Sequence, residues 1–365
     1  MAVSEAEQVE QQDAGSRMIR ARRVLHHARG LLGRRALHLV GFLIFVYLFL
    51  QLVPGFAGAL ESLRGVSASW IVGALFVETL SQCGYVVSWT GILDPDGLLR
   101  AEGRGRHLGA RVAWSQLGGG MVVPGGTIGS MGVGAWMLHR LGMPMSKVGE
   151  RQFTLMFLNT GVDAIAIVIF GLLLALGFFG GGPSLALTLG PALVVAAGLA
   201  LVLVVARGAE KLAARVRPRR PRIAAGIKTL ALAVENTRDM LRHRGSGKIV
   251  LGAIAYLGLD MLVLQGSFLA IGADPVPSFA VIAMCYLIGG LAGSIPLPAN
   301  LGAVTGMTAM LIVFGVDHND AVAAVVLYQS IGYIVPLAGG GIAYLFLRRE
   351  FGDKALLAET AGAGP

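Results

Sequence analysis

The chain has 365 residues, of which 55% are hydrophobic and only 14% are charged, and its formal net charge is +9. Soluble domains carry about 25% charged residues, so the composition excludes a soluble domain and indicates an integral membrane protein. The positive charge lies in loops between apolar stretches, which argues against a nucleic-acid-binding protein. No cofactor or metal site is indicated, because Cys83 and Cys285 both lie in apolar segments and the histidines show no paired ligand spacing.

The first 36 residues are polar and basic, so they do not have the apolar core of a secretory signal peptide. Residues 16–36 interleave arginine with apolar residues at helical spacing, which suits an amphipathic helix on an anionic membrane surface. A solvated basic leader that only sets the orientation of the chain explains the pattern equally well. In either case residues 1–36 are predicted to be a cytoplasmic leader.

Six apolar stretches are long enough to cross about 30 Å of hydrocarbon. They lie at 37–56, 68–92, 153–177, 185–206, 249–271 and 320–347. Two further stretches, 111–142 and 280–316, are too long for one crossing and are interrupted by glycine and proline.

The first interrupted stretch cannot be one regular helix. Eight of the seventeen residues from Gly118 to Gly134 are glycine, and Pro124 lies among them. Glycine costs about 1 kcal/mol and proline about 3 kcal/mol inside a helix, which predicts a break at Pro124, Gly125 and Gly126. Irregular backbone at membrane depth is tolerated only inside protein or beside a water-filled cavity. Two short apolar arms around such a break are typical of a transporter's substrate site.

The positive charges then predict the topology, because basic residues concentrate on the cytoplasmic side. If both interrupted stretches return to the side from which they enter, 29 of the 30 lysines and arginines are cytoplasmic and only Arg64 is outside. If each crossed once, the loop 207–248, with twelve of these charges, would be external. We therefore predict six full spans, two re-entrant or paired-helix hairpins, and cytoplasmic N- and C-termini.

The two hairpins also resemble each other. Residues 120–143 align without a gap on residues 293–316, at an offset of 173. Five of these 24 positions are identical: Gly120/Gly293, Gly129/Gly302, Met137/Met310, Leu138/Leu311 and Gly142/Gly315. Each half has three spans, an odd number, so the second half crosses the membrane with the opposite orientation. Such inverted repeats recur in transporters. The predicted fold is an all-α inverted repeat with halves 37–177 and 185–349, and a disordered tail at 350–365.

Three acids lie within predicted spans: Glu78, Asp163 and Asp260. A charge at this depth costs about 2.5 kcal/mol or more and marks a functional position by default. No lysine or arginine lies at comparable depth, so these acids are expected to be protonated, to bind a cation or to face a wet cavity. The alternative is a protonated carboxyl that only hydrogen-bonds to a neighbouring helix. The functional interpretation is favoured for Asp163.

Other polar groups lie beside the two hairpins. Asn300 lies at the predicted break of the second hairpin, where its amide and the freed backbone groups suit a polar headgroup. Arg140, Lys147 and Arg151 flank the first hairpin on the cytoplasmic side, where they either receive a lipid phosphate or only fix the orientation. An enzyme is not indicated, because no histidine lies in a span to activate Ser130.

Two stretches of the chain resemble the transmembrane part of lysylphosphatidylglycerol synthases, also called the flippase-like membrane family. One is LAGSIPLPANLGAVTG, followed by Gly315-Val316 and LYQSIGYIVPLAGGGIAYLFLRR; the other is the first hairpin with LHRLGMPMSKVGERQFTLMFLNTGVD. The resemblance runs from about residue 37 to 349. Relatives usually carry an acid at the position of Thr305 and an arginine at that of Gln329, so a neutral Thr305–Gln329 contact is expected to replace that pair. The soluble aminoacyl-transferase domain is not recognised, so synthesis of an aminoacylated lipid is not expected.

The resemblance implies a bacterial inner-membrane protein that moves a phospholipid or polyprenyl-type lipid between leaflets, with basic loops on an anionic membrane surface. The alternatives are a secondary transporter of a small soluble substrate and a non-transporting scaffold or regulator. The predicted transport residues are Pro124, Gly125, Gly126, Gly129, Asp163, Asp260, Pro296, Pro298, Asn300, Gly302, Thr305 and Gln329.

Overall fold

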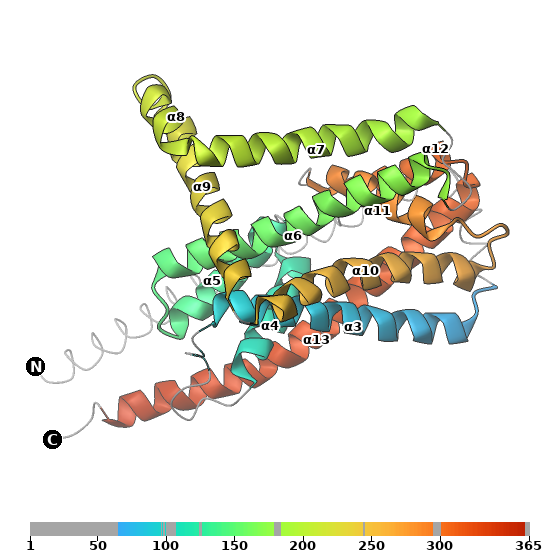
Figure 1. Cartoon of the computed structure of the whole chain (residues 1–365). Coiled ribbons are helices and arrows are strands. Elements are labelled where there is room, and N and C mark those ends of the chain that lie inside the picture. Colours follow the sequence, from blue (N-terminus) through green and yellow to red (C-terminus); the bar gives the residue numbers. More distant parts are fainter. Residues whose placement is uncertain are drawn as a thin grey trace, which may run out of the picture. The chain divides into compact units, whose positions relative to one another are not determined.

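The computed structural model describes residues 65–95, 97, 99, 107–123, 126–178, 184–243, 245–294 and 301–361 (Figure 1). All of them belong to one compact unit formed by residues 57–365. These residues form eleven α-helices and one short 3₁₀ helix, with no β-strand among them. The predicted leader 1–36 and the predicted span 37–56 lie outside the described residues.

Five of the described helices are long and apolar enough to cross a membrane. They are α3 (Ala68–Leu93), α6 (Met145–Ala175), α7 (Leu185–Arg207), α10 (Ser246–Ile271) and α13 (His318–Ala361), of which His318–Arg349 forms the apolar part. They coincide with five of the six predicted spans and run in roughly the same direction in Figure 1. Helix α13 continues through 350–361, which the sequence had placed in a disordered tail.

Four of the described helices lie in the two interrupted stretches and are each too short to cross a membrane. They form two pairs, α4 (Leu108–Val122) with α5 (Gly126–Arg140), and α11 (Phe279–Leu291) with α12 (Leu301–Val313), and the members of each pair pack against each other. The 15 residues of α4 extend only about 22 Å at 1.5 Å per residue, against about 30 Å of hydrocarbon. Each interrupted stretch thus contains two short helices packed on each other, and whether they form hairpins that return to the same side stays a prediction. Helix α4 ends at Val122 and α5 begins at Gly126, on either side of the predicted break.

The two pairs share the same contacts between their helices. In the first, a Cβ on Gly134 would collide with Oε1 of Gln116; in the second, a Cβ on Gly289 would lie 2.5 Å from the backbone of Met307. Positions 289 and 307 lie 173 residues after 116 and 134. Equivalent positions therefore meet in both pairs, through the Gln116 side chain in the first and through the Met307 backbone in the second.

The ends of the two pairs also match. Gly142 follows α5 with φ +94°, and Gly315 follows α12 with φ +88°. The next residue donates its backbone N–H to Leu138 O in the first pair and to Leu311 O in the second, at 3.0 Å in both. This left-handed ending satisfies free carbonyls at a helix C-terminus and favours glycine. Both glycines are among the five identities that the sequence alignment predicted.

Helices α3 and α10 form the closest packing of two long helices. A Cβ on Gly84 would lie 2.7 Å from Gly252 O, and a Cβ on Gly252 would lie 2.7 Å from Gly84 O. Two serine hydroxyls of α3 donate across the same contact, Ser81 to Tyr256 O at 2.8 Å and Ser88 to Ile249 O at 2.7 Å. Small residues let membrane helices approach closely, and hydroxyls then join their backbones.

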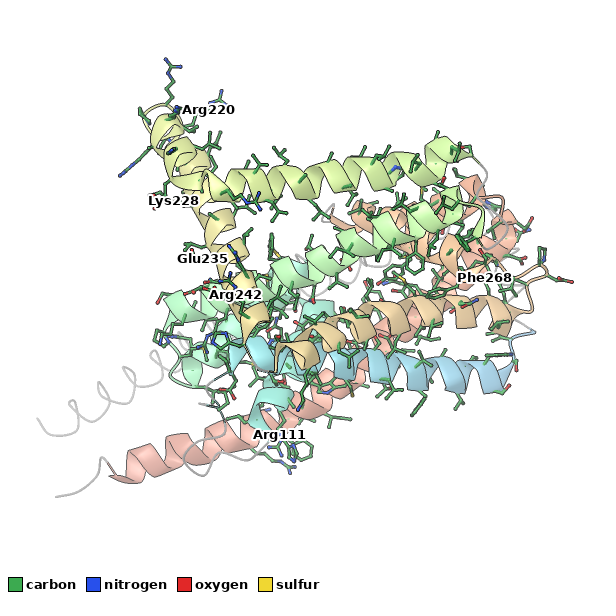
Figure 2. All side chains as sticks on the ribbon, in the orientation of Figure 1. Arg111, Arg220, Lys228, Glu235, Arg242 and Phe268 are labelled. Atoms are coloured by element: carbon green, nitrogen blue, oxygen red, sulfur yellow. The ribbon has the colours of Figure 1, made fainter. Side chains whose placement is uncertain are left out.

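Helices α8 (Ala209–Val216) and α9 (Pro221–Arg242) connect α7 to α10, and α9 packs on α6, α7 and α10. Figure 2 shows Arg220, Lys228, Glu235 and Arg242 along α9 at one end of the long helices, whereas Phe268 lies toward the other end. These charged residues of the basic loop 207–248 thus lie at one end of the long helices. This arrangement fits a helix that lies on the membrane surface.

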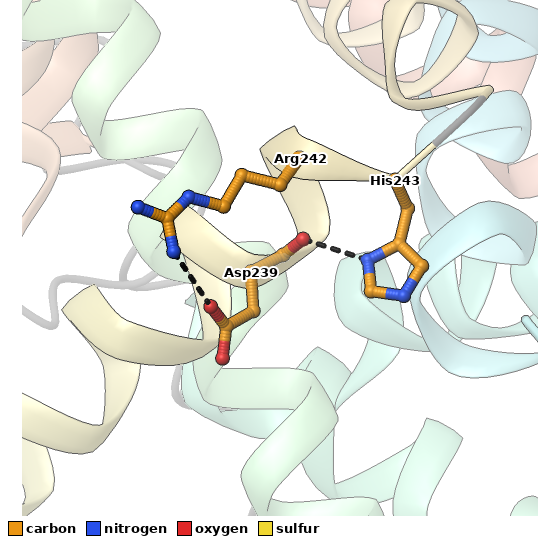
Figure 3. A network of polar contacts seen from close by, with 3 residues as sticks. All are labelled: Asp239, Arg242 and His243. Atoms are coloured by element: carbon orange, nitrogen blue, oxygen red, sulfur yellow. Dashed lines mark hydrogen bonds and ion pairs between the residues drawn. The ribbon is translucent and has the colours of Figure 1, made fainter.

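The last turn of α9 carries a small polar network (Figure 3). Arg242 Nη1 lies 3.9 Å from Asp239 Oδ1, and His243 Nδ1 donates to the Asp239 carbonyl oxygen at 2.7 Å. Exposed pairs of this kind contribute only about 0–1 kcal/mol to stability. Asp239 is therefore a suitable control position for the loss of one carboxylate.

Candidate functional site

Asp260 of α10 lies at the centre of a buried polar group between the long helices. Its Oδ2 accepts hydrogen bonds from two tyrosine hydroxyls, Tyr286 of α11 and Tyr328 of α13, the latter at 3.0 Å. The rings of the two tyrosines pack edge to face, with centroids 6.0 Å apart. Two phenol donors on one oxygen fix the orientation of the carboxyl group and stabilise its ionised form.

The other two acids that the sequence singled out point to the same place. Glu78 of α3 is 1% exposed and lies within hydrogen-bonding reach of Asp260. Asp163 of α6 interacts electrostatically with Asp260. Gln82, one turn after Glu78, donates its amide N–H to Glu78 Oε1 at 2.5 Å. Five helices thus contribute to what we call the acid–tyrosine cluster: Glu78, Gln82, Asp163, Asp260, Tyr286 and Tyr328.

The cluster does not have the geometry of a metal centre. Among the described residues, no group of three or more histidines, cysteines, aspartates or glutamates is placed to hold a metal ion. The side chains with which Glu78 and Asp260 interact are carboxyls, phenols and one amide. What these oxygens can do chemically is to accept, hold and release protons.

A second buried network centres on Gln116 of α4. Its Oε1 accepts from Trp89 Nε1 and Gln152 Nε2, both at 2.9 Å, and its Nε2 donates to the Tyr85 hydroxyl at 3.1 Å. Ser130 of α5 donates to the Gln116 carbonyl oxygen at 3.0 Å. The network holds the first helix pair against α3 and α6.

Two tyrosines in contact lie between this network and the acid–tyrosine cluster. The rings of Tyr85 and Tyr256 lie 5.3 Å apart, and Tyr256 interacts electrostatically with all three acids of the cluster. Tyr85 and Tyr256 therefore connect Gln116, through a hydrogen bond and a ring contact, to a phenol that interacts electrostatically with Asp260.

Replacing Gly134 by alanine is expected to lower stability by about 1 kcal/mol. The new methyl group collides with the Gln116 amide, and overpacking costs about 1–3 kcal/mol, from which the better helix propensity of alanine subtracts up to about 1 kcal/mol. Gly132→Ala is the matched control, because a Cβ there meets nothing within 4 Å. It should leave the melting temperature in detergent unchanged or raise it. Equal melting temperatures for the two variants would contradict the packing described for Gln116.

An apolar groove of about 590 Å³ lies between the first helix pair and α13. Its lining includes Gly119, Val122, Gly129, Trp136 and Tyr344. Val122 is 69% exposed and Trp136 is 49% exposed, so the groove opens at the outer surface of the helices. Its floor contains Ser115, whose Oγ is buried without a hydrogen-bond partner.

The remaining predicted transport residues do not form one site in the described part of the chain. Gly129 lines the groove, and a Cβ on Gly302 would collide with the Ala292 carbonyl oxygen. Thr305 donates to Gly302 O at 3.2 Å, and Gln329 forms a side-chain hydrogen bond with Tyr333. The Thr305–Gln329 contact stays a prediction. Gly126 begins α5, while Pro124, Gly125, Pro296, Pro298 and Asn300 lie outside the described residues.

The three basic residues near the first pair have different surroundings. Arg140 stacks over the Trp136 ring, with its guanidinium carbon 5.8 Å from the centroid, and Lys147 is exposed. Arg151 donates to Leu93 O at 2.9 Å, at the C-terminus of α3. Cations stabilise helix C-termini, so Arg151 has a structural contact that the sequence did not predict.

Sequence reasoning missed Gln116, Gln152, Tyr286 and Tyr328. The tyrosines stand in apolar helices, where an aromatic residue is usually a packing residue. Gln116 is a different case, because a large amide two residues before a run of glycines is itself a signal that something must fill the missing side-chain volume. Its 1% exposure and four partners show that it does so.

Comparison with known proteins gives one match. The family described as Lysylphosphatidylglycerol synthase TM region matches residues 37–340, which include the acid–tyrosine cluster, both helix pairs and four of the five described candidate spans in full. No curated protein matches the chain. The match covers most of the chain and agrees with the family that its hairpin motifs resemble. The chain therefore belongs to the family of the lysylphosphatidylglycerol synthase transmembrane region.

Proposed function

We propose that the protein moves a phospholipid or a polyprenyl-type lipid between the two leaflets of a bacterial inner membrane. Membership of the family supports a role in membrane-lipid biology. The observation that carries the transport proposal is the convergence of three acids from three long apolar helices. Glu78 and Asp260 are buried within hydrogen-bonding reach of each other, and the half-buried Asp163 interacts electrostatically with Asp260. Acids at this depth usually mark a substrate or proton pathway, and a scaffold with a packed apolar interior has no need of them.

In this proposal the two helix pairs are re-entrant hairpins of an inverted repeat. The contact between positions 116 and 134, repeated at 289 and 307, supports the repeat, as do the left-handed endings at Gly142 and Gly315. The packing of the long helices agrees with it: α3 and α10, the equivalent members of the two halves, pack on each other, and α4 packs on α13 as α11 packs on α6. In transporters built in this way, one repeat rocks against the other around a substrate site at their interface.

The apolar groove beside α5 favours a lipid over a small soluble substrate. It is lined by apolar side chains and opens at the outer surface through Val122 and Trp136, so an acyl chain can enter it from the bilayer. Arg140, which stacks on Trp136 near the end of α5, and the exposed Lys147 then receive the lipid phosphate on the cytoplasmic side. The headgroup crosses along the polar residues between Gln116 and Asp260, with proton exchange at Asp163 and at Asp260 with its neighbour Glu78 coupled to its movement.

Reconstitution tests the proposal directly. Proteoliposomes containing the full chain and fluorescent phospholipids of several headgroup classes are treated with a membrane-impermeant quencher, with and without a proton gradient. We expect at least one lipid class to reach the opposite leaflet faster than in protein-free vesicles. If every class moves at the protein-free rate under both conditions, the translocase proposal is wrong. If a water-soluble dye-coupled substrate moves while lipids do not, the soluble-transporter alternative replaces it.

Asp163→Asn is expected to slow lipid movement about threefold, which corresponds to ~0.7 kcal/mol in the barrier. The substitution removes the proton-binding carboxyl but keeps the size and hydrogen-bonding capacity of the side chain. Asp239→Asn, at the exposed end of α9, is the control for loss of one acid and should transport at the normal rate. An unchanged rate in Asp163→Asn, with an unchanged melting temperature, would remove Asp163 from the coupling site.

A further inference from the structure

We propose that Glu78 and Asp260 bind one exchangeable proton between them, as a carboxylic acid next to a carboxylate, with the proton on Glu78. The pair lies between α3 and α10, about two turns from the Gly84–Gly252 contact. It does not depend on which substrate the protein moves; only its link to transport rests on the proposed function.

The hydrogen bonds assign the ionised member of the pair. Asp260 Oδ2 receives two hydroxyl protons, from Tyr286 and Tyr328. A carboxylate can only accept, whereas a protonated carboxyl must also donate. Two convergent phenol donors therefore favour the charged form of Asp260. Glu78, by contrast, receives one donor, the neutral amide of Gln82.

The unpaired atoms assign the protonated member. Glu78 Oε1 accepts from Gln82, but Glu78 Oε2 and Gln82 Oε1 are both buried without any hydrogen-bond partner. A buried acceptor with no donor costs about 1–3 kcal/mol, and more when it carries charge. A proton on Glu78 Oε2 turns that atom from an unpaired acceptor into a donor next to the Asp260 carboxylate.

Electrostatics also requires that Glu78 and Asp260 hold one proton between them. Two adjacent carboxylates in a low-dielectric site cannot both ionise, so one of them retains a proton. The titratable groups that interact with the pair are Asp163 of α6, Tyr256 of α10, Tyr286 of α11 and Tyr328 of α13. Acids and phenols bring no positive charge, and no lysine or arginine of the described helices figures among the groups that act on the pair. A proton is therefore the cation that these oxygens hold.

Infrared spectroscopy of the full chain in lipid nanodiscs tests the site without any transport measurement. The wild-type protein at neutral pH should show the C=O stretching band of a buried protonated carboxyl, shifted in D₂O and lost as the pH rises. Labelling glutamate with ¹³C should shift this band, whereas labelling aspartate should not. The labels identify the residue type in the unmodified chain, so the assignment stands even if a variant does not fold.

Substitutions then assign the individual residue. Glu78→Gln should remove the band, and Asp260→Asn should keep it at a shifted frequency, because an amide replaces the carboxylate as acceptor. Asp239→Asn is the control and should change nothing. The proposal is overturned if the band is absent at neutral pH, survives in Glu78→Gln, or disappears in Asp163→Asn instead. It is also overturned if NaCl at fixed pH removes the band, since an alkali cation then occupies the pair. Normal lipid movement without the band rejects this inference alone, and the band without lipid movement rejects the proposed function alone.

Discussion

Asp260→Asn is expected to reduce lipid movement in proteoliposomes by about tenfold or more, equivalent to at least ~1.4 kcal/mol in the barrier. The effect should exceed that of Asp163→Asn because Asp260 interacts with both other acids and accepts from two tyrosines. An asparagine oxygen still accepts those two hydrogen bonds, so the helices should stay together. The substitution removes the negative charge of Asp260, which stabilises the proton on the neighbouring Glu78.

The measurement compares initial rates of lipid movement with melting temperatures in the same preparation. A rate that falls while the melting temperature stays within a few degrees supports a role in coupling. The rate of Asp260→Asn should also lose its dependence on an imposed proton gradient. If transport continues at the wild-type rate, or if rate and stability fall together, Asp260 is a structural residue and the acid–tyrosine cluster does not couple transport to protons.

Gly84→Ala is expected to lower the stability of the folded protein by about 2–3 kcal/mol. The new Cβ would lie 2.7 Å from Gly252 O and 2.9 Å from Tyr256 N, which are backbone atoms that cannot rotate away. Helices α3 and α10 must separate to admit it, and the hydroxyl bonds of Ser81 and Ser88 to the α10 backbone lengthen with them. Gly252→Ala should have a similar effect, because the contact is reciprocal.

Two glycines on the same helices provide the controls. A Cβ at Gly73 of α3 or at Gly258 of α10 meets nothing within 4 Å. Their alanine variants should unfold at or above the wild-type temperature, because alanine is the better helix former. Thermal unfolding in mild detergent, followed by circular dichroism, distinguishes the two classes. If all of the alanine variants behave alike, glycine acts in these helices through backbone flexibility and not through the close contact.

The long helices could be predicted from the sequence because each needs only a sufficient apolar length. The boundaries of α3, α7 and α10 lie within a few residues of the predicted spans 68–92, 185–206 and 249–271. The two helix pairs were also predictable, since glycine and proline break a helix through local backbone properties. The C-terminal end of α13 was not, because residues 350–361 carry the polar composition that a solvated helix and a disordered tail share.

The site was only partly predictable, for a physical reason. Burial of an acid is costly wherever it occurs, so Glu78, Asp163 and Asp260 could be recognised one at a time. Their meeting depends on the rotation of α3, α6 and α10 about their axes, which is set by contacts such as Gly84 with Gly252. Tyrosine tolerates both apolar and polar neighbours, so nothing in the sequence distinguished Tyr286 and Tyr328 from packing residues.

The equivalent contacts in the two helix pairs constrain their divergence differently. The side chain of Gln116 fills the space at Gly134, so a larger residue at 134 requires a smaller one at 116. Gly289 instead meets the backbone of Gly306 and Met307, which no change of side chain at 307 can move away. A functional chimaera of the two halves therefore has to transfer positions 116 and 134 together, whereas position 289 has to remain glycine whatever residue stands at 307.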